Sequence, residues 1–238
     1  MDAIFTSSRG ATMEGDIKDW HPNPSKLYYY ARSSAKLEDL RHQAYDFLEK
    51  NDDPTNCHVY FIAGLCDITY RDRYGNYDEV YYIESTQATV NRMTRLIDSI
   101  SLDIQVYGAK PCFATIIPCS LDDWNHLRLS QHKTSHLLHY HQYSDMQALL
   151  NRTILDINHH ISATNKSNQM QTPHLANCVT TQRRFEPPRF HLYRLADGVH
   201  PAPELSEKWS MWLRKCLANN RYKATPQASG WDEIPDRK

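Results

Sequence analysis

The sequence predicts an α/β protein built on one open, mainly parallel β-sheet with helices on both faces. Short apolar runs alternate with amphipathic stretches about five times along the 238 residues. One run, Val59 to Ala63, is apolar or aromatic at every position, as in a strand buried on both faces of a parallel sheet. Strand followed by helix, repeated in this way, specifies right-handed crossovers between parallel strands.

In the first half of the chain, residues 3–7 form a short apolar run and predict a buried strand. A second strand is expected at 26–31, which holds three consecutive tyrosines. Apolar residues at helical spacing then predict a helix over 36–50, before the strand at 59–63. Residues 70–83 are rich in tyrosine and charge and predict a hairpin at the edge of the sheet.

The second half repeats this alternation of helices and strands. Helices are predicted where apolar residues recur three and four positions apart, and strands where β-branched and aromatic residues follow one another. The predicted elements are helix 90–104, strand 112–117, helix 146–161, strand 190–195 and helix 203–219. We therefore expect a five-stranded sheet in a single domain over residues 1–221, and a polar tail or linker over 222–238.

Composition narrows the class of protein and its location. Hydrophobic residues make up 40% of the chain, and the formal net charge is -1, so bulk charge directs the protein to neither nucleic acid nor membrane. No segment has the length of a membrane helix, and the N-terminus carries no secretion signal. The six cysteines lack metal-ligand spacing, and several lie in apolar runs, which is typical of buried thiols in an intracellular protein, cytoplasmic or nuclear.

Two distant segments carry the residues of a candidate catalytic site. Asp197 and His200 lie three positions apart in a loop between the predicted strand 190–195 and the last helix. Ser8 follows the first predicted strand. A serine hydroxyl needs a base within hydrogen-bond reach and a third group to orient that base. Since ligands bind beyond the carboxyl ends of the strands in such sheets, these three side chains are expected to meet there.

At this point the chain resembles the SGNH hydrolases, also called GDSL-type esterases and acylhydrolases. The resemblance covers about residues 3–217, and its strongest piece is Asp197 to Pro201, which matches the family's Asp-x-x-His block. Thr6 to Gly10 stands where the family has Gly-Asp-Ser, and Phe61 to Asp67 stands where it has Gly-x-Asn-Asp. The helix from Met146 to Asn165 is similar to the family's fourth helix. More loosely, the chain resembles SGNH-like domains of invertebrate mobile genetic elements.

The resemblance implies a flavodoxin-like, three-layer α/β/α fold, and it assigns roles to residues. Ser8 would be the nucleophile, His200 the general base and acid, and Asp197 the carboxylate that orients it. Gly64 and Asp67 match their block, whereas Cys66 stands where the family has an oxyanion-hole asparagine and Ser34 where it has a glycine. The resemblance implies that these four residues line the oxyanion hole and the pocket. A thiol is a weak hydrogen-bond donor, and losing one such donor typically slows turnover by about 10²–10³.

Two functions follow from these matches and departures. The first is an esterase or acylhydrolase that forms an acyl-serine intermediate on a small ester substrate, needs no cofactor, and has weakened activity. The second is an inactive SGNH-fold protein that binds nucleic acid or a protein partner. Arg183 and Arg184 form a basic segment that suits an anionic ligand in either case, although basic loops are usually just solvated.

Other interpretations of single residues remain open. Ser8 alone is more typical of a turn or helix cap than of a nucleophile, and Asp197 with Gly198 is also a common turn sequence. Cys66 is a candidate nucleophile in its own right, although a small buried residue is the commoner role of cysteine. Of the four histidines between 132 and 141, three have helical spacing, but no carboxylate or cysteine stands with them at ligand spacing, so we predict no metal site.

Overall fold

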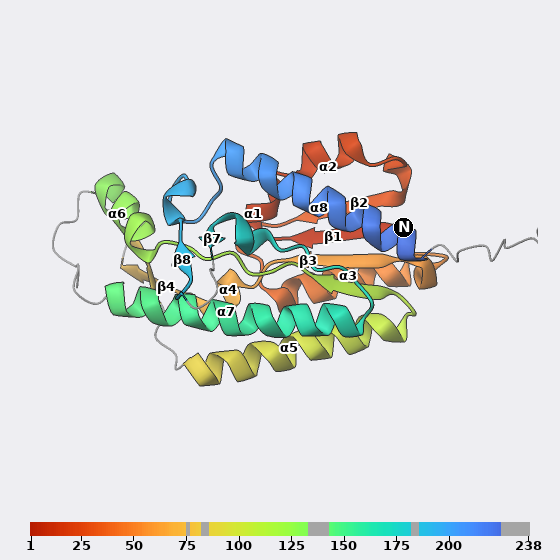
Figure 1. Cartoon of the computed structure of the whole chain (residues 1–238), viewed down its shortest axis with the longest axis horizontal. Coiled ribbons are helices and arrows are strands. Elements are labelled where there is room, and N and C mark those ends of the chain that lie inside the picture. The colour runs from red at the N-terminus through yellow and green to blue at the C-terminus, as the bar shows by residue number, and fades with distance from the viewer. Residues whose placement is uncertain (75–76, 82–85, 133–142, 182–185, 225–238) are drawn as a thin grey trace, which may run out of the picture.

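The computed structural model describes residues 1–74, 77–81, 86–132, 143–181 and 186–224, and these form a parallel sheet between two layers of helices (Figure 1). The main sheet has the order β2-β1-β3-β6. Its strands are β1 (Asp2–Thr6), β2 (Leu27–Ala31), β3 (His58–Ile62) and β6 (Lys110–Phe113). All three neighbouring pairs are parallel, which confirms the predicted class of fold.

Helices cover both faces of the sheet (Figure 1). One face packs against α2 (Glu14–Trp20) and α8 (Pro203–Ala224), and the other against α3 (Leu37–Glu49), α5 (Thr86–Val106) and α7 (Tyr143–Ser167). The predicted helices are therefore present, and α8 extends three residues into the predicted tail, of which 225–238 lie outside the described residues. Within the described chain, no helix combines the length and the apolar character that crossing a bilayer requires.

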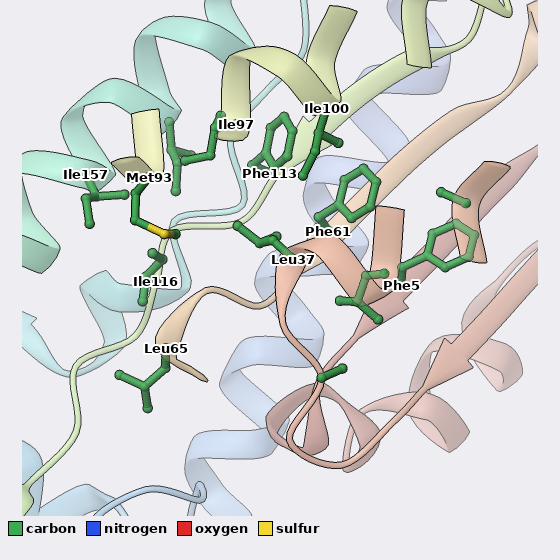
Figure 2. Close-up of a cluster of buried hydrophobic side chains, with 14 of the residues drawn as sticks. Phe5, Leu37, Phe61, Leu65, Met93, Ile97, Ile100, Phe113, Ile116 and Ile157 are labelled. Carbon is green, nitrogen blue, oxygen red and sulfur yellow. The ribbon is translucent and has the colours of Figure 1, made fainter. Parts of the chain in front are cut away.

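Alternation along the strands divides the core into two clusters, one on each face. Phe5, Phe61 and Phe113 point to the face covered by α3, α5 and α7 (Figure 2), while Ile4 and Tyr60 point to the other. The three phenylalanines occupy matching register positions on β1, β3 and β6. Their rings stack at centroid distances of 5.9 Å and 5.2 Å, so one aromatic row ties three strands together.

Shorter elements connect these layers. The predicted hairpin is confirmed, since β4 (Tyr70–Tyr74) and β5 (Tyr77–Tyr81) pair antiparallel. Several helices were not predicted from the sequence. These are α1 (Ser8–Ala11), α2, α4 (Leu65–Ile68), α6 (Leu121–His132), and the 3₁₀ turns Pro24–Lys26, Pro54–Asn56, Leu175–Cys178 and Leu192–Arg194. Most have too few turns to show a periodic pattern, and α6 is longer but has a weak apolar periodicity.

The fifth strand, predicted at 190–195, is wrong. Only β8 (Arg189–Phe190) is extended there, and it pairs antiparallel with β7 (Thr180–Thr181) apart from the main sheet. A 3₁₀ turn follows at Leu192–Arg194. In the described chain the main sheet therefore has four strands, and β6 is an edge strand.

The edge of β6 and of the segment that follows it is covered by side chains instead of a fifth strand. The amide of Asn165, on α7, accepts from the N–H of Phe113 at 2.9 Å and donates to its carbonyl at 2.7 Å. Two turns earlier on the same helix, the amide of Asn158 does the same for Ile116, at 2.6 Å and 2.8 Å. A side-chain amide has the same donor and acceptor as a peptide group, so both asparagines act like residues of a neighbouring strand.

This arrangement predicts the effect of replacing Asn165 by leucine. Asn165→Leu is similar in volume but leaves the buried N–H and C=O of Phe113 without partners, so the free energy of unfolding should fall by about 3 kcal/mol. Asn91→Leu is the control, because Asn91 is an exposed residue of α5. Both are measured by urea unfolding, and equal stabilities of the two variants would contradict the proposed pairing.

Candidate active site

Ser8 lies at the point where the chain leaves the middle of the sheet. Strand β1 lies between β2 and β3, and the N–H of Ser7 still bonds to the carbonyl of Ile62 on β3 at 3.2 Å. Ser8 then begins α1. Because the connections from β1 to β2 and from β2 to β3 run to opposite sides, this is the switch in strand order where such folds bind their ligands.

Asp197 and His200 lie on a closed loop just before α8. The N–H of Ala196 donates to the carbonyl of His200 at 2.8 Å, and Leu195 forms an antiparallel bridge with Pro201. Gly198 makes the turn between them with a φ of 79°, a conformation that strongly favours glycine. The two functional side chains therefore project from a short loop whose ends are joined.

The structure brings Ser8, His200 and Asp197 together in one hydrogen-bonded chain. Ser8 Oγ lies 3.1 Å from His200 Nε2, and His200 Nδ1 lies 2.7 Å from Asp197 Oδ2. Asp197 accepts the imidazole hydrogen at Nδ1, which leaves Nε2 as the acceptor for the serine hydroxyl. Nucleophile, base and orienting carboxylate have this same relation in serine hydrolases.

Asp197 is held in its ionised form. Burial by itself would raise the pKa of its carboxyl group, but hydrogen bonds from His200 and Val199 outweigh that effect and lower the pKa below its ordinary value. Its Oδ1 accepts the backbone N–H groups of Val199 at 2.9 Å and His200 at 2.6 Å. The carboxylate is therefore available to orient the imidazole at neutral pH.

The loop that carries Asp197 and His200 is fixed against the start of α6. The carbonyl of Gly198 accepts the N–H of Ser120 at 2.7 Å. The ring of Trp124, which is buried, lies 5.9 Å from the imidazole of His200, centroid to centroid. The sequence alone gave no sign of this support, because α6 was not predicted and contacts between distant segments cannot be read from spacing.

Three of the four residues expected to line the pocket lie at the start of short turns or helices or in an exposed loop. Gly64 follows β3 and precedes α4 with a φ of 117°, and Cys66 lies on α4, half-buried. Ser34 is exposed and has a φ of 57°, so this serine adopts the left-handed backbone that glycine favours. All six cysteines of the chain are thiols, and the other five are buried.

Asp67 is a structural support rather than part of an open pocket. It is buried, and both of its carboxylate oxygens accept the N–H of Leu37, at 3.2 Å and 3.1 Å. Asp67 therefore joins α4 to the first residue of α3. Burial raises its pKa to about 6, although the hydrogen bond from Leu37 and the charges of Lys36 and Arg92 act in the opposite direction.

The predicted basic segment lies outside the described residues, and so does most of the histidine-rich segment. The residues concerned are Arg183, Arg184, His136, His139 and His141. In the part of the chain that is described, no group of three or more histidine, cysteine or acidic side chains could hold a metal ion.

Sequence reasoning overlooked Arg9, which lies directly beside Ser8. Its side chain is buried under the site and donates to the carbonyl of Pro118 at 3.2 Å and to that of Ile117. An arginine next to a serine is unremarkable in a sequence, because arginine is usually exposed.

No protein-family model matches the chain, and no curated protein matches it either. Solved structures do match. A GDSL-like lipase from Bacteroides thetaiotaomicron superposes with a TM-score of 0.55 at 12% identity, over 94% of this chain and 89% of that one. A lipase/acylhydrolase from Enterococcus faecalis superposes with a TM-score of 0.54 at 10% identity, over 92% of this chain and 95% of that one. A member of the lipolytic G-D-S-L family from Veillonella parvula superposes with a TM-score of 0.56 at 9% identity, over 91% of this chain and 97% of that one. The chain therefore has the fold of the SGNH, or GDSL-type, lipolytic hydrolases.

The turn at Gly198 predicts a sensitive position. A Cβ at residue 198 would lie 2.8 Å from the carbonyl oxygen of Ser120 and 2.8 Å from the nitrogen of Trp124. Gly198→Ala should therefore lower the free energy of unfolding by about 1–3 kcal/mol. Gly15→Ala is the control, because a Cβ there meets nothing within 4 Å and alanine favours the helix. A Gly198→Ala protein as stable as the control would contradict this account of the loop.

The raised pKa of Asp67 predicts that stability falls as pH rises. Its carboxyl group binds a proton more tightly in the folded chain than in the unfolded chain, where the pKa is about 3.9. The stabilisation is thus complete below about pH 4 and is lost as pH passes 6. Asp67→Asn imitates the protonated acid, and should be more stable than the unmodified protein at pH 8 by up to about 3 kcal/mol.

The measurement is urea unfolding at pH 4.5 and pH 8, with Asp19→Asn as the control at an exposed aspartate. The advantage of Asp67→Asn should fall to about 1 kcal/mol at pH 4.5. A variant less stable than the unmodified protein at pH 8 would show that the ionised carboxylate supports the fold.

Proposed function

We propose that this protein is a serine hydrolase of the SGNH type that cleaves small carboxylic esters through an acyl-serine intermediate. The observation that carries the proposal is the continuous hydrogen-bonded chain from Ser8 through His200 to Asp197. Its position at the switch in strand order supports the proposal, and so does the fold shared with GDSL-type lipases and acylhydrolases.

In the first half of the reaction, His200 Nε2 takes the proton of the Ser8 hydroxyl as Oγ attacks the carbonyl carbon of the ester. Asp197 stabilises the imidazolium that forms, and accepts the Nδ1 hydrogen throughout. The tetrahedral intermediate collapses, and His200 returns the proton to the departing alcohol. The acyl group is then bound to Ser8 as an ester.

In the second half, His200 takes a proton from the water that attacks the acyl-serine, and gives it to Ser8 Oγ as the bond to the acyl group breaks and the acid departs. The backbone N–H groups of Ser8 and Ser34 are the candidate donors for the negatively charged oxygen. Cys66 contributes at most a weak S–H donor, so turnover on ordinary esters should be low.

Cys66 also favours the second function, a binding protein that keeps the fold without catalysis. A pocket with one strong donor fewer has less capacity to stabilise an oxyanion. Nucleic acid and protein partners are both compatible with the basic pair Arg183 and Arg184, and such binding would be sensitive to salt.

One assay separates these two functions. The unmodified protein, Ser8→Ala and His200→Ala are compared on short-chain chromogenic esters and by labelling with a fluorescent phosphonate that reacts with activated serines. We expect both variants to lose at least about 10³-fold in hydrolysis and to lose the label. Ser206→Ala is the matched control, since Ser206 bonds to Thr12 at the surface and should leave both readouts unchanged. Equal rates in all four proteins would reject the hydrolase and leave the binding function.

A further inference from the structure

Arg9 carries a buried charge that no carboxylate neutralises at short range. Its side chain is 5% exposed. Its two terminal nitrogens donate to neutral carbonyl groups, those of Ile117 and Pro118, and its Nε atom has no partner within the described chain. No acidic group among the described residues lies within ion-pair distance of the guanidinium, which is unusual because buried charges are normally paired.

Two of the groups that influence this guanidinium, Cys66 and Asp197, belong to the candidate active site. Burial is the largest influence on Arg9 and lowers the pKa of its guanidinium, whereas the nearby Cys119, Cys66 and Asp197 act to raise it. Asp197 offsets part of the charge from a distance, but its own oxygens are occupied by His200 and Val199. Arg9 and Ser7 also line a small cavity of about 20 Å³ at the end of the sheet.

Two roles for Arg9 make different demands on its charge. If the side chain only anchors the segment from Ile117 to Pro118, a neutral donor would serve, and the protein would avoid the cost of burying a cation. If the positive charge of Arg9 has a function of its own, that charge must stabilise a negatively charged group in the site. A positive charge in a region of low dielectric constant stabilises nearby anions much more than it would in water.

We infer that Arg9 is an electrostatic positioning group that makes the region around Ser8 and Cys66 favourable for negative charge. The guanidinium does not touch a substrate, because it is buried beneath the site. It acts through its field on an anion that forms or binds there. In the proposed hydrolysis, this anion is the negatively charged oxygen of the tetrahedral intermediate. That part of the inference rests on the proposed function.

Cys66 provides a probe that does not depend on hydrolysis. Of the six cysteines, it alone is not buried, so alkylating reagents should modify it first, and mass spectrometry identifies the modified peptide. Iodoacetate carries a negative charge, and iodoacetamide is neutral and of similar size. The ratio of their rates at Cys66 therefore reports the local potential and cancels changes in the reactivity of the thiol that affect both reagents.

We expect the ratio of iodoacetate to iodoacetamide rates to fall about tenfold in Arg9→Met. Arg9→Lys keeps a charge without the two-pronged donor and should stay within about threefold of the unmodified protein. Arg214→Met is the matched control, because Arg214 also donates to a carbonyl group, that of Asp16 at 2.8 Å, but lies on α8 at the surface. An unchanged ratio in a folded Arg9→Met protein would overturn the inference.

Two further comparisons keep the test decisive. If Arg9→Met does not fold, the ratio at Cys66 is compared between the folded and the urea-unfolded chain of the unmodified protein, and equal ratios would overturn the inference. On esters, Arg9→Met should lower kcat more than it raises KM, with partial recovery in Arg9→Lys. Should the unmodified protein hydrolyse nothing, the alkylation ratios still decide the role of Arg9, so failure of one proposal does not conceal failure of the other.

Discussion

The hydrogen bond between Ser8 and His200 joins two residues that are 192 positions apart in the chain. It forms only because β1 lies in the middle of the sheet and the loop before α8 is held beside its carboxyl end. Three contacts secure that loop: the bridge between Leu195 and Pro201, the bond from Ser120 to the carbonyl of Gly198, and the ring of Trp124 against His200. The chemistry proposed for the site thus depends on packing by the start of α6.

Much of this arrangement was predictable from the sequence. Four of the five predicted strands and all the long predicted helices are present, because buried parallel strands and amphipathic helices have distinct periodicities. The strand predicted at 112–117 is displaced, since β6 begins at Lys110 and ends at Phe113. The meeting of Ser8 with Asp197 and His200 followed from the rule that the carboxyl ends of parallel strands share one edge. Features that depend on periodicity and on the order of the elements were therefore predictable from the sequence.

The sequence-based predictions are wrong where side chains, in place of a neighbouring strand, form hydrogen bonds to the backbone. Residues 190–195 have the composition of a strand, yet the place beside β6 is filled by the amides of Asn158 and Asn165 and by the carbonyl of Pro173, which accepts from Thr115 at 3.1 Å. Neither asparagine can be distinguished from a solvated one in the sequence. The burial of Arg9 escaped prediction for the same reason, since only the folded chain shows that Ile117 and Pro118 turn their carbonyl groups toward it.

The two borders of the sheet differ in a way that affects how this molecule meets others. The border along β6 and the segment after it is covered. Helix α7 engages the backbone of Phe113 and Ile116 through side-chain amides, and the carbonyl of Pro173 accepts the N–H of Thr115. Strand β2, at the opposite border, pairs only with β1 among the described residues, and its tyrosines are partly accessible to solvent. An unpaired strand can accept an extended peptide by adding it to the sheet. Strand addition by a second chain, whether in recognition or in aggregation, would therefore begin at β2, far from the asparagine-covered border.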